Sequence, residues 1–246
     1  MRLTRVHVDA PLSPGTELAL PESAAVHLSR VLRLSAGDEC VLFNGDGHDY
    51  AARIVTADKR GMRVAVADCR VVDSESPLRI TLLQGVARGE KMDLILQKAT
   101  ELGVTSFAPL WSQRSEVKLE GERMAKRLAH WRGVVASACE QCGRARVPGV
   151  ASPVALAAAL EAMPAGGLRL ILDPDGELVM GGDMSLSADD QVALAVGPEG
   201  GWSPSDREQL RNAGFHGLRL GPRILRTETA GLAAIAALQS RFGDLA

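Results

Sequence analysis

Three loops in the C-terminal half of the chain combine residue types that can bind a small molecule through the backbone. They are Leu172-Asp173-Pro174-Asp175-Gly176, Gly197-Pro198-Glu199-Gly200-Gly201, and a third loop from Leu220 to Arg226. Glycine allows close backbone approach, and proline fixes φ, so that neighbouring carbonyls can be held towards a ligand. Ile224 and Leu225 can pack on the faces of a flat heterocycle. A single loop of this kind would be an ordinary tight turn, whereas three at successive strand ends predict a shared pocket.

The chain lacks the standard phosphate-binding motifs. No GxGxxG follows the first strand of this half, and GxxxxGK[ST] is absent. These are the defining residues of dinucleotide and P-loop sites. The loops therefore favour a cofactor without a large phosphate load.

Alternating strands and helices must position these loops. Beyond a polar linker at Asp73–Pro77, apolar runs of strand length alternate with helical patterns. We expect strands over Ile80–Val86, Val104–Leu110, Leu168–Leu172 and Val192–Val196, and helices over Lys91–Leu102, Glu122–Cys139, residues 155–162, Ser205–Ala213 and Thr229–Arg241. This order predicts an α/β domain with a parallel sheet covered by helices on both faces and ligand sites at the carboxyl ends of its strands.

The N-terminal part has a different pattern, typical of a small barrel. Expected strands are Glu39–Phe43, Tyr50–Thr56 and Met62–Ala67, with turns at Asn44–Gly47 and Lys59–Gly61 and a short helix over Ser23–Leu32.

Charge is unevenly distributed along the chain, although the net charge is only −2. Residues 85–146 hold eleven Lys and Arg against seven Asp and Glu, a net charge of +4. Within this segment the helix expected over Glu122–Cys139 has an apolar stripe and a basic one, the latter made by Arg123, Lys126, Arg127 and His130. The segment is either a surface for a polyanion or an ordinary solvated face.

Several classes of protein are disfavoured. No apolar run is long enough to span a membrane, and the N-terminus lacks the apolar region of a signal peptide, so we expect a cytoplasmic protein. Cys139 and Cys142 form a lone CxxC at a helix end, without a second pair, and we expect packing groups there and no metal.

Two of the loops resemble the signature motifs of one family. The strings are Ala195–Ser203 (AVGPEGGWS) and Leu220–Ala230 (LGPRILRTETA). The resemblance continues through Lys91–Val104, Arg114-Ser115, Glu140-Gln141 with Arg144, Val147-Pro148, His27–Leu34 and Gly37-Asp38, and so covers nearly the whole chain. The chain is similar to the 16S ribosomal RNA (uracil-N3) methyltransferases, within the SPOUT class of knotted enzymes. It departs at Arg88, where relatives often have Lys, and at Asp206, where they often have Glu.

The resemblance implies an architecture and an activity. It implies an RNA-binding PUA-like β-barrel over residues 1–72 and a SPOUT methyltransferase domain with a deep trefoil knot over residues 73–246. It implies S-adenosylmethionine as cofactor, a homodimer, and methylation of N3 of one uridine in 16S rRNA, with the assembled small subunit as preferred substrate.

The expected site residues follow from the loops and the resemblance together. The cofactor contacts are expected at Leu172, Asp173, Pro174, Gly197, Pro198, Glu199, Gly200, Gly201, Leu220, Gly221, Ile224, Leu225 and Arg226. Arg226 is expected to stabilise the uracil anion, or else to pair with Glu228 or Glu199. Glu228 is the candidate proton acceptor, or else a first-turn acid that complements the helix dipole. Thr227 is expected as an N-cap, and Thr229 as a hydrogen-bonding group for uracil or cofactor.

The RNA contacts are expected from the basic middle segment and the N-terminal barrel. They are Arg2, Arg5, Arg30, Arg33, Arg88, Lys91, Arg114, Arg144 and Arg146. The chain has one Tyr, four Phe and three Trp, which disfavours extensive base stacking and favours recognition of a folded particle by shape.

Three other functions remain open from the residues alone. They are a non-catalytic RNA-binding or ribosome-assembly protein, a SPOUT enzyme with a tRNA base or a ribose hydroxyl as target, and an enzyme that uses another nucleotide cofactor.

Overall fold

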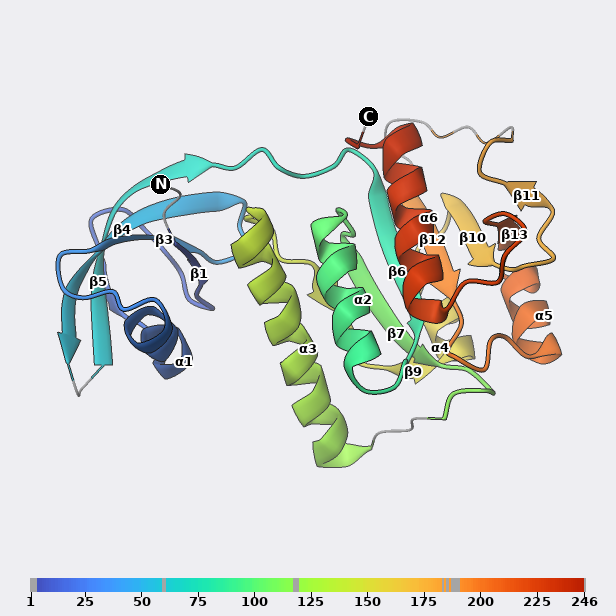
Figure 1. Cartoon of the computed structure of the whole chain (residues 1–246), viewed down its shortest axis with the longest axis horizontal. Coiled ribbons are helices and arrows are strands. Elements are labelled where there is room, and N and C mark those ends of the chain that lie inside the picture. The colour runs from blue at the N-terminus through green and yellow to red at the C-terminus, as the bar shows by residue number, and fades with distance from the viewer. Residues whose placement is uncertain are drawn as a thin grey trace. The chain divides into compact units, whose positions relative to one another are not determined.

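The computed structural model describes residues 4–58, 61–116, 120–182, 184, 186 and 191–245. The chain forms two compact units (Figure 1). Unit 1 combines Met1–Glu75 with Ala136–Val147, and unit 2 combines Ser76–Val135 with Pro148–Ala246. The unit boundary at Glu75 lies three residues beyond the one expected after residue 72, and the second segment of unit 1 had no counterpart in the sequence-based division.

Unit 1 is built on a five-stranded sheet with the order β1-β3-β4-β5-β2. Its strands are β1 (Arg5–His7), β2 (Glu17–Ala19), β3 (Glu39–Phe43), β4 (His48–Asp58) and β5 (Gly61–Val71), with α1 (Glu22–Val26) and a π-helical turn (His27–Val31) between β2 and β3. The turn at Asn44–Gly47 joins the antiparallel strands β3 and β4, as predicted. In the second predicted turn, Lys59 and Arg60 lie outside the described residues. Leu28, Leu42 and Val64 are fully buried in the core of this unit.

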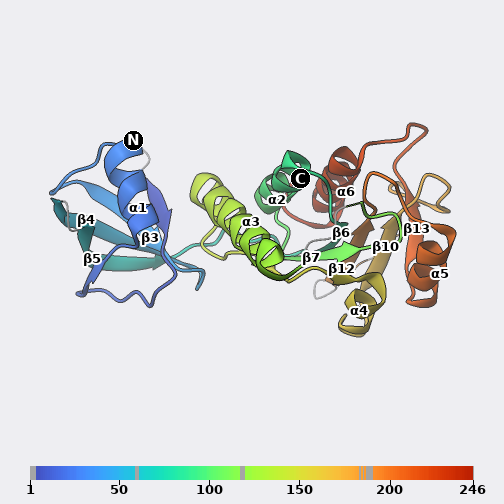
Figure 2. The same ribbon diagram turned by 90° about the horizontal axis from the view of Figure 1, so that it is seen from below.

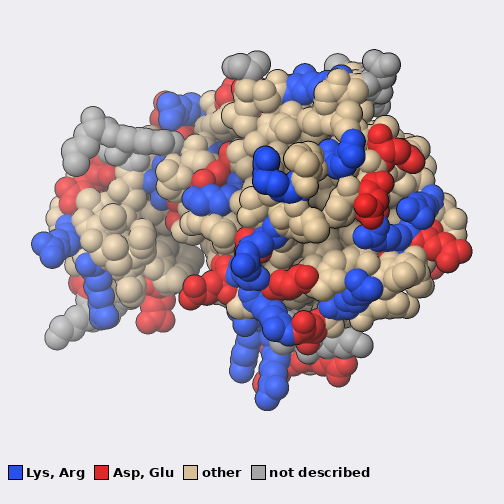
Figure 3. All heavy atoms as spheres, turned by 45° about the vertical axis from the view of Figure 1, so that its right-hand side comes forward, with Lys and Arg blue, Asp and Glu red and all other residues tan. Residues whose placement is uncertain are grey.

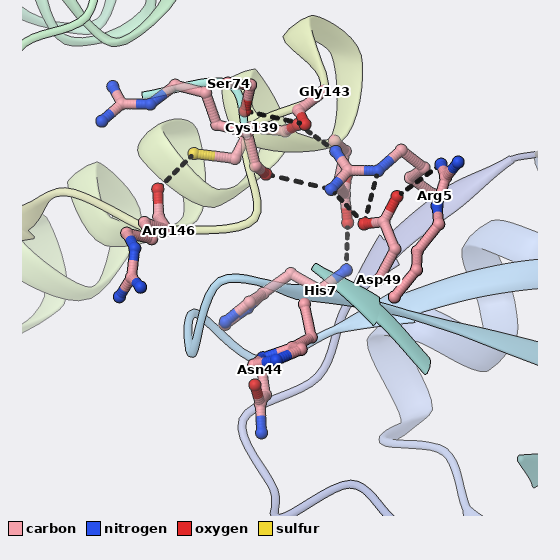
Figure 4. Close-up of polar contacts among 12 residues, drawn as sticks. Arg5, His7, Asn44, Asp49, Ser74, Cys139, Gly143 and Arg146 are labelled. Carbon is pink, nitrogen blue, oxygen red and sulfur yellow. Dashed lines mark hydrogen bonds and ion pairs between the residues drawn. The ribbon is translucent and has the colours of Figure 1, made fainter. Parts of the chain in front are cut away.

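The end of a long helix completes unit 1 through the side chain of Arg5. Helix α3 (Gly121–Cys142) ends here, and the Arg5 guanidinium donates to the Cys139 carbonyl at 2.7 Å and to the Arg144 carbonyl at 3.1 Å. The same guanidinium pairs with Asp49 at 2.6 Å, and both side chains are 4% exposed (Figure 4). A cation at this position complements the negative end of the helix dipole. Residues distant in sequence are thus joined by buried polar contacts.

Unit 2 is a parallel α/β domain, as predicted. Its sheet has the order β11-β13-β10-β12-β6-β7-β8, and β9 also pairs with β7. The strands are β6 (Arg79–Gly85), β7 (Ser106–Trp111), β8 (Gly149–Val150), β9 (Val154–Ala155), β10 (Leu168–Leu172), β11 (Leu178–Val179), β12 (Gln191–Val196) and β13 (His216–Arg219). All the pairs in this sheet are parallel.

Helices cover both faces of this sheet. Figure 2 shows α2 (Glu90–Glu101) and α6 (Thr227–Phe242) on one face, and α4 (Leu156–Glu161) and α5 (Pro204–Asn212) on the other. A sheet covered in this way has buried strands, and residues 192–196 of β12 are all buried. No helix in the described part of the chain is long and apolar enough to cross a membrane.

Candidate active site

The register of the parallel sheet brings the predicted loops together. Val196 at the end of β12 pairs with Gln84 near the end of β6, and Leu172 at the end of β10 pairs with Leu218 of β13. The segments that follow these strand ends therefore emerge at the same edge of the sheet.

These segments enclose a cavity of about 390 Å³ within unit 2. Its lining includes all the predicted cofactor contacts except Gly200: Leu172, Asp173, Pro174, Gly197, Pro198, Glu199, Gly201, Leu220, Gly221, Ile224, Leu225 and Arg226. It also includes Lys91, Val196, Trp202, Arg207, Leu218, Arg223, Thr227, Glu228 and Ala230. The volume and the mixture of apolar side chains with a few polar groups are those of a small-molecule site.

The loop after β12 is held against β6 by a close backbone approach. A Cβ atom added to Gly85 would lie 2.5 Å from the Pro198 nitrogen and 2.6 Å from the Pro198 Cδ. The clash would be with backbone and with a ring, neither of which can move freely. Glycine at the end of β6 is therefore required for the loop to sit where it does.

Thr227 ties the start of α6 to the ends of β12 and β6. Its hydroxyl donates to the Gly197 carbonyl at 2.5 Å and accepts a hydrogen bond from Gln84 Nε2 at 3.1 Å. Both side chains come from buried residues. The helix begins at Thr227 with Arg226 as its N-cap, so the expected N-cap role for Thr227 is wrong. Because its hydroxyl is engaged with another strand end, Thr227 fixes the geometry of the cavity wall.

Lys91, and not Arg226, pairs with the two acids that were considered as alternative partners of Arg226. Its ammonium lies 3.3 Å from Glu199 and 3.8 Å from Glu228. Arg226 forms no ion pair with a described residue, and it is exposed at the cavity lining. The alternative in which Arg226 neutralises either acid is therefore not supported, and its guanidinium is available to a ligand.

Glu199 fastens its loop to the start of α2. Its carboxylate accepts a hydrogen bond from the Arg88 backbone at 3.0 Å. Partial burial acts to raise the pKa of Glu199, but the backbone N–H groups of Arg88 and of Glu199 itself, together with the Lys91 ammonium, outweigh burial and lower it. Glu199 is thus held as a carboxylate that contributes to loop structure.

Glu228 presents an oxygen without a hydrogen bond. Its Oε2 atom is buried and has no hydrogen-bond partner among the described residues, and it forms an ion pair with Lys91 at 3.8 Å. Such an oxygen can accept a proton or a donor from a ligand. Thr229, by contrast, is exposed and does not line the cavity, because one further residue of helix turns its side chain away from Glu228. Its predicted contact with substrate or cofactor is not supported.

Two other loop residues have partners within the protein. Arg207 of α5 pairs with Asp173 at 2.6 Å, and Asp173 is buried, so that its carboxylate is already neutralised. The Gly200 carbonyl accepts from Arg114 at 3.1 Å, and Gly200 does not line the cavity. Asp206, the position at which relatives often have Glu, forms a capping box with Ser203 at the start of α5.

The predicted RNA contacts fall into three groups. Arg30, Arg33, Arg88, Arg114 and Arg146 are exposed, which is compatible with phosphate contacts. Lys91 lines the cavity. Arg5 and Arg144 are buried, and Arg144 pairs with Glu75 at 2.6 Å, so both stabilise unit 1 and are corrected from RNA contacts to structural groups. Arg2 lies outside the described residues.

Sequence reasoning missed several lining residues, among them Trp202 and Arg207. Trp202 is buried, and its indole Nε1 has no hydrogen-bond partner among the described residues. It directly follows the Gly197–Gly201 loop, which was the available signal. Arg207 gave no such signal, because its position one helical turn into α5 is visible only after folding.

Cys139, the first cysteine of the CxxC segment, is buried. Burial raises the pKa of the Cys139 thiol to about 12, so this group stays protonated at neutral pH. Among the described residues, no group of three or more His, Cys, Asp and Glu side chains is arranged to hold a metal ion.

Comparisons with known proteins agree with this geometry. Residues 74–239 match the model of an RNA methyltransferase domain, and residues 20–66 match that of an RNA methyltransferase PUA domain. The ribosomal RNA small subunit methyltransferase E of Buchnera aphidicola is 31% identical over 99% of this chain and 98% of its own. That of Aquifex aeolicus is 33% identical over 92% and 95%. The chain belongs to this RNA methyltransferase family.

Solved structures of family members include cofactor complexes. The methyltransferase E of Neisseria gonorrhoeae, bound to S-adenosyl methionine, is 41% identical, with a TM-score of 0.93 and full coverage of both chains. A methyltransferase of Legionella pneumophila in complex with the same cofactor is 38% identical, with a TM-score of 0.94 and full coverage. The methyltransferase presented here therefore has the predicted combination of a PUA-like unit and a SPOUT-type α/β domain.

Proposed function

We propose that this methyltransferase transfers a methyl group from S-adenosylmethionine to N3 of one uridine in small-subunit 16S rRNA, on the assembled subunit. The observation that carries the proposal is the meeting of three loops and the start of α6 at one cavity. The names of the relatives support a substrate in small-subunit rRNA. The string Leu220–Ala230 supports the uracil-N3 specificity through its resemblance to that family.

The cavity fits the proposed cofactor. Leu172, Leu220, Ile224 and Leu225 provide apolar surface for an adenosine, and the Gly197–Gly201 loop provides backbone groups at close range. The unpartnered Nε1 of buried Trp202 is a donor that a ligand can satisfy. When bound, S-adenosylmethionine supplies an electrophilic methyl group on its sulfonium.

Arg226 and Glu228 are the residues that act on the uracil base in this proposal. N3 of uracil carries a proton and is a poor nucleophile until that proton is removed. Oε2 of Glu228, which lacks a hydrogen bond from the described residues, accepts the proton, and the Arg226 guanidinium stabilises the negative charge that develops on the O2–N3–O4 system of the base. Rigid walls, fixed by Thr227 and Gly85, hold N3 in line with the methyl group, and positioning of this kind can supply on the order of 7–11 kcal/mol.

The remaining expectations stay part of this proposal. They are the knotted crossing of unit 2, a cytoplasmic homodimer, an RNA-binding role for the N-terminal domain, and RNA contacts by Arg30, Arg33, Arg88, Arg114 and Arg146. Light scattering at micromolar concentration tests the dimer, and a mass of one chain would refute it.

Labelled methyl transfer tests substrate and product together. Purified enzyme is incubated with labelled S-adenosylmethionine and with small subunits, large subunits, deproteinised 16S rRNA or tRNA, followed by nucleoside analysis. We expect 3-methyluridine with small subunits. Label in a tRNA nucleoside or in a ribose 2′-O-methyl group would refute the assignment, and lack of cofactor binding in calorimetry would favour a non-catalytic RNA-binding protein.

The Glu228→Gln variant tests the proton acceptor. The amide keeps the size of the side chain but cannot take the proton, so we expect single-turnover methyl transfer to slow by about 10²–10⁴-fold, the usual contribution of a general base. Cofactor affinity should change little. Glu208→Gln, on the exposed side of α5, is the matched control. An unchanged rate and pH profile in Glu228→Gln would leave Glu228 as a first-turn acid of α6.

A further inference from the structure

Contacts on one side of helix α3 determine which of its side chains face the protein and which face solvent. Leu128, Trp131 and Val135 are buried against the protein. Arg132 donates from Nε and Nη2 to the Val150 carbonyl at 3.3 and 3.2 Å. Residues on the opposite side of this part of the helix must therefore face solvent.

Three cations lie on that solvent side and define what we call the α3 basic face: Arg123, Lys126 and Arg127. All three are exposed, and their spacing of three and four residues places them on neighbouring turns of one surface. Figure 3 shows Lys and Arg side chains gathered at the bottom of the view, the level at which α3 begins in Figure 1.

The charge of the α3 basic face is scarcely neutralised by carboxylates. Arg123 and Arg127 have no ion-pair partner among the described residues, and the pair of Lys126 with Glu122 spans 3.7 Å between side chains 79% and 90% exposed. A pair so exposed contributes little. Other cations are paired more closely, since exposed Arg53 lies 2.6 Å from Glu39 and half-buried Lys98 lies 2.9 Å from Glu101. The whole chain has a net charge of −2, so this face is a local concentration of positive charge.

Helix α3 is connected to the active site through α2. His130, one turn beyond the basic face, has its Nε2 2.8 Å from Asp93 Oδ2 in α2. Two residues before Asp93, Lys91 lines the cavity between Glu199 and Glu228. A polyanion bound to α3 would thus lie on a helix that directly contacts α2, the helix that contributes Lys91 to the cavity lining.

We propose that the α3 basic face binds the phosphate backbone of the RNA substrate. This inference rests on the proposed function and adds to it a docking surface separate from the methyl-transfer cavity. Closely spaced cations, two of them without an ion-pair partner among the described residues, match the repeated charges of an RNA strand, and phosphate contacts set the position of RNA without reading its sequence. The face therefore contributes to binding and positioning, while the chemistry stays at Arg226 and Glu228.

The test compares two triple variants that lose the same charge. One is Arg123→Gln with Lys126→Gln and Arg127→Gln; the control is Arg79→Gln with Lys98→Gln and Arg211→Gln, three cations of unit 2 that lie on separate elements, β6, α2 and α5. Affinity for small subunits and for deproteinised 16S rRNA is measured between 0.05 and 0.5 M salt. Calorimetry with S-adenosylmethionine reports whether each variant keeps a folded active site.

Loss of three phosphate contacts should lower the slope of log affinity against log salt by about 2 and weaken binding about a hundredfold at 0.1 M salt, for both RNA forms. The KM for RNA should rise while kcat and cofactor affinity stay at the wild-type values. Equal losses in the control variant, or a wild-type salt slope in the α3 variant, would overturn the proposal. Weaker binding to subunits but not to free RNA would assign the face to an acidic protein surface instead. Absence of methyl transfer by the wild-type enzyme would refute the proposed function, and the binding comparison would still decide the role of this face.

Discussion

The Thr227 hydroxyl offers a direct test of how the active-site wall is held together. Thr227→Val preserves the shape of the side chain but removes the donor to the Gly197 carbonyl and the acceptor for Gln84 Nε2. Gln84 Nε2 keeps its bond to the Gly85 carbonyl at 2.9 Å, so the heaviest loss falls on Gly197. With each unsatisfied buried group costing about 1–3 kcal/mol, we expect the free energy of unfolding to fall by about 2–4 kcal/mol.

Urea unfolding followed by circular dichroism measures this change, and calorimetry measures the affinity for S-adenosylmethionine. Thr227→Ser is the control, because it keeps the hydroxyl and loses one methyl group, a change worth about 1 kcal/mol. We expect cofactor affinity to fall in the valine variant and to be retained in the serine variant. If the free energies of unfolding of the two variants differ by less than about 0.5 kcal/mol, as is usual for surface substitutions, the hydroxyl does not join these strands.

Three further predictions concern groups around the two units. Gly85→Ala should abolish cofactor binding in calorimetry or prevent folding, because the new Cβ meets the Pro198 nitrogen at 2.5 Å; wild-type affinity would contradict the close approach. The pKa of Glu199 is lowered in the folded state, so the stability contributed by its carboxylate is present above the ordinary carboxyl pKa and is lost as pH falls through the lowered value. Glu199→Gln should therefore be less stable than wild type at pH 7. In urea titrations this difference should disappear at acid pH. Cys139, with a pKa of about 12, should react far more slowly with a thiol reagent at pH 8 than exposed Cys69, as mass spectrometry of the modified peptides would report; comparable rates would show that the end of α3 opens readily.

The hydrophobic pattern was sufficient to predict the parallel sheet and its site. Buried strands such as Leu168–Leu172 need apolar residues on both faces, so their positions are visible in the sequence, and this strand was predicted to the residue. The Gly-Pro loops that follow these strands then predicted where the cavity lies, because the carboxyl ends of parallel strands lie at the same edge of the sheet. The α6 start was predicted two residues too late, since Thr227 is hydrophilic but packs inward through its hydroxyl.

Burial of charged groups could not be predicted in the same way. Arg5 and Arg144 have the residue type of RNA contacts, and only long-range packing supplies their partners, Asp49 and Glu75. Lys91 was likewise expected to contact RNA, and its position beside Glu199 and Glu228 depends on how α2 meets a loop and the start of α6, both more than a hundred residues away. Which oxygen of Glu228 lacks a donor is also a property of the folded site alone.

The two-part composition of unit 1 has a consequence for how the protein is made. Its second part, Ala136–Val147, is synthesised long after Glu75, yet Arg5 needs the Cys139 and Arg144 carbonyls as acceptors. During translation the N–H groups of the Arg5 guanidinium therefore remain hydrated until most of α3 has left the ribosome. Unit 1 thus cannot reach its final structure before the first strands of unit 2 have been synthesised, and a fragment that stops at Glu75 would lack the acceptors that complete it.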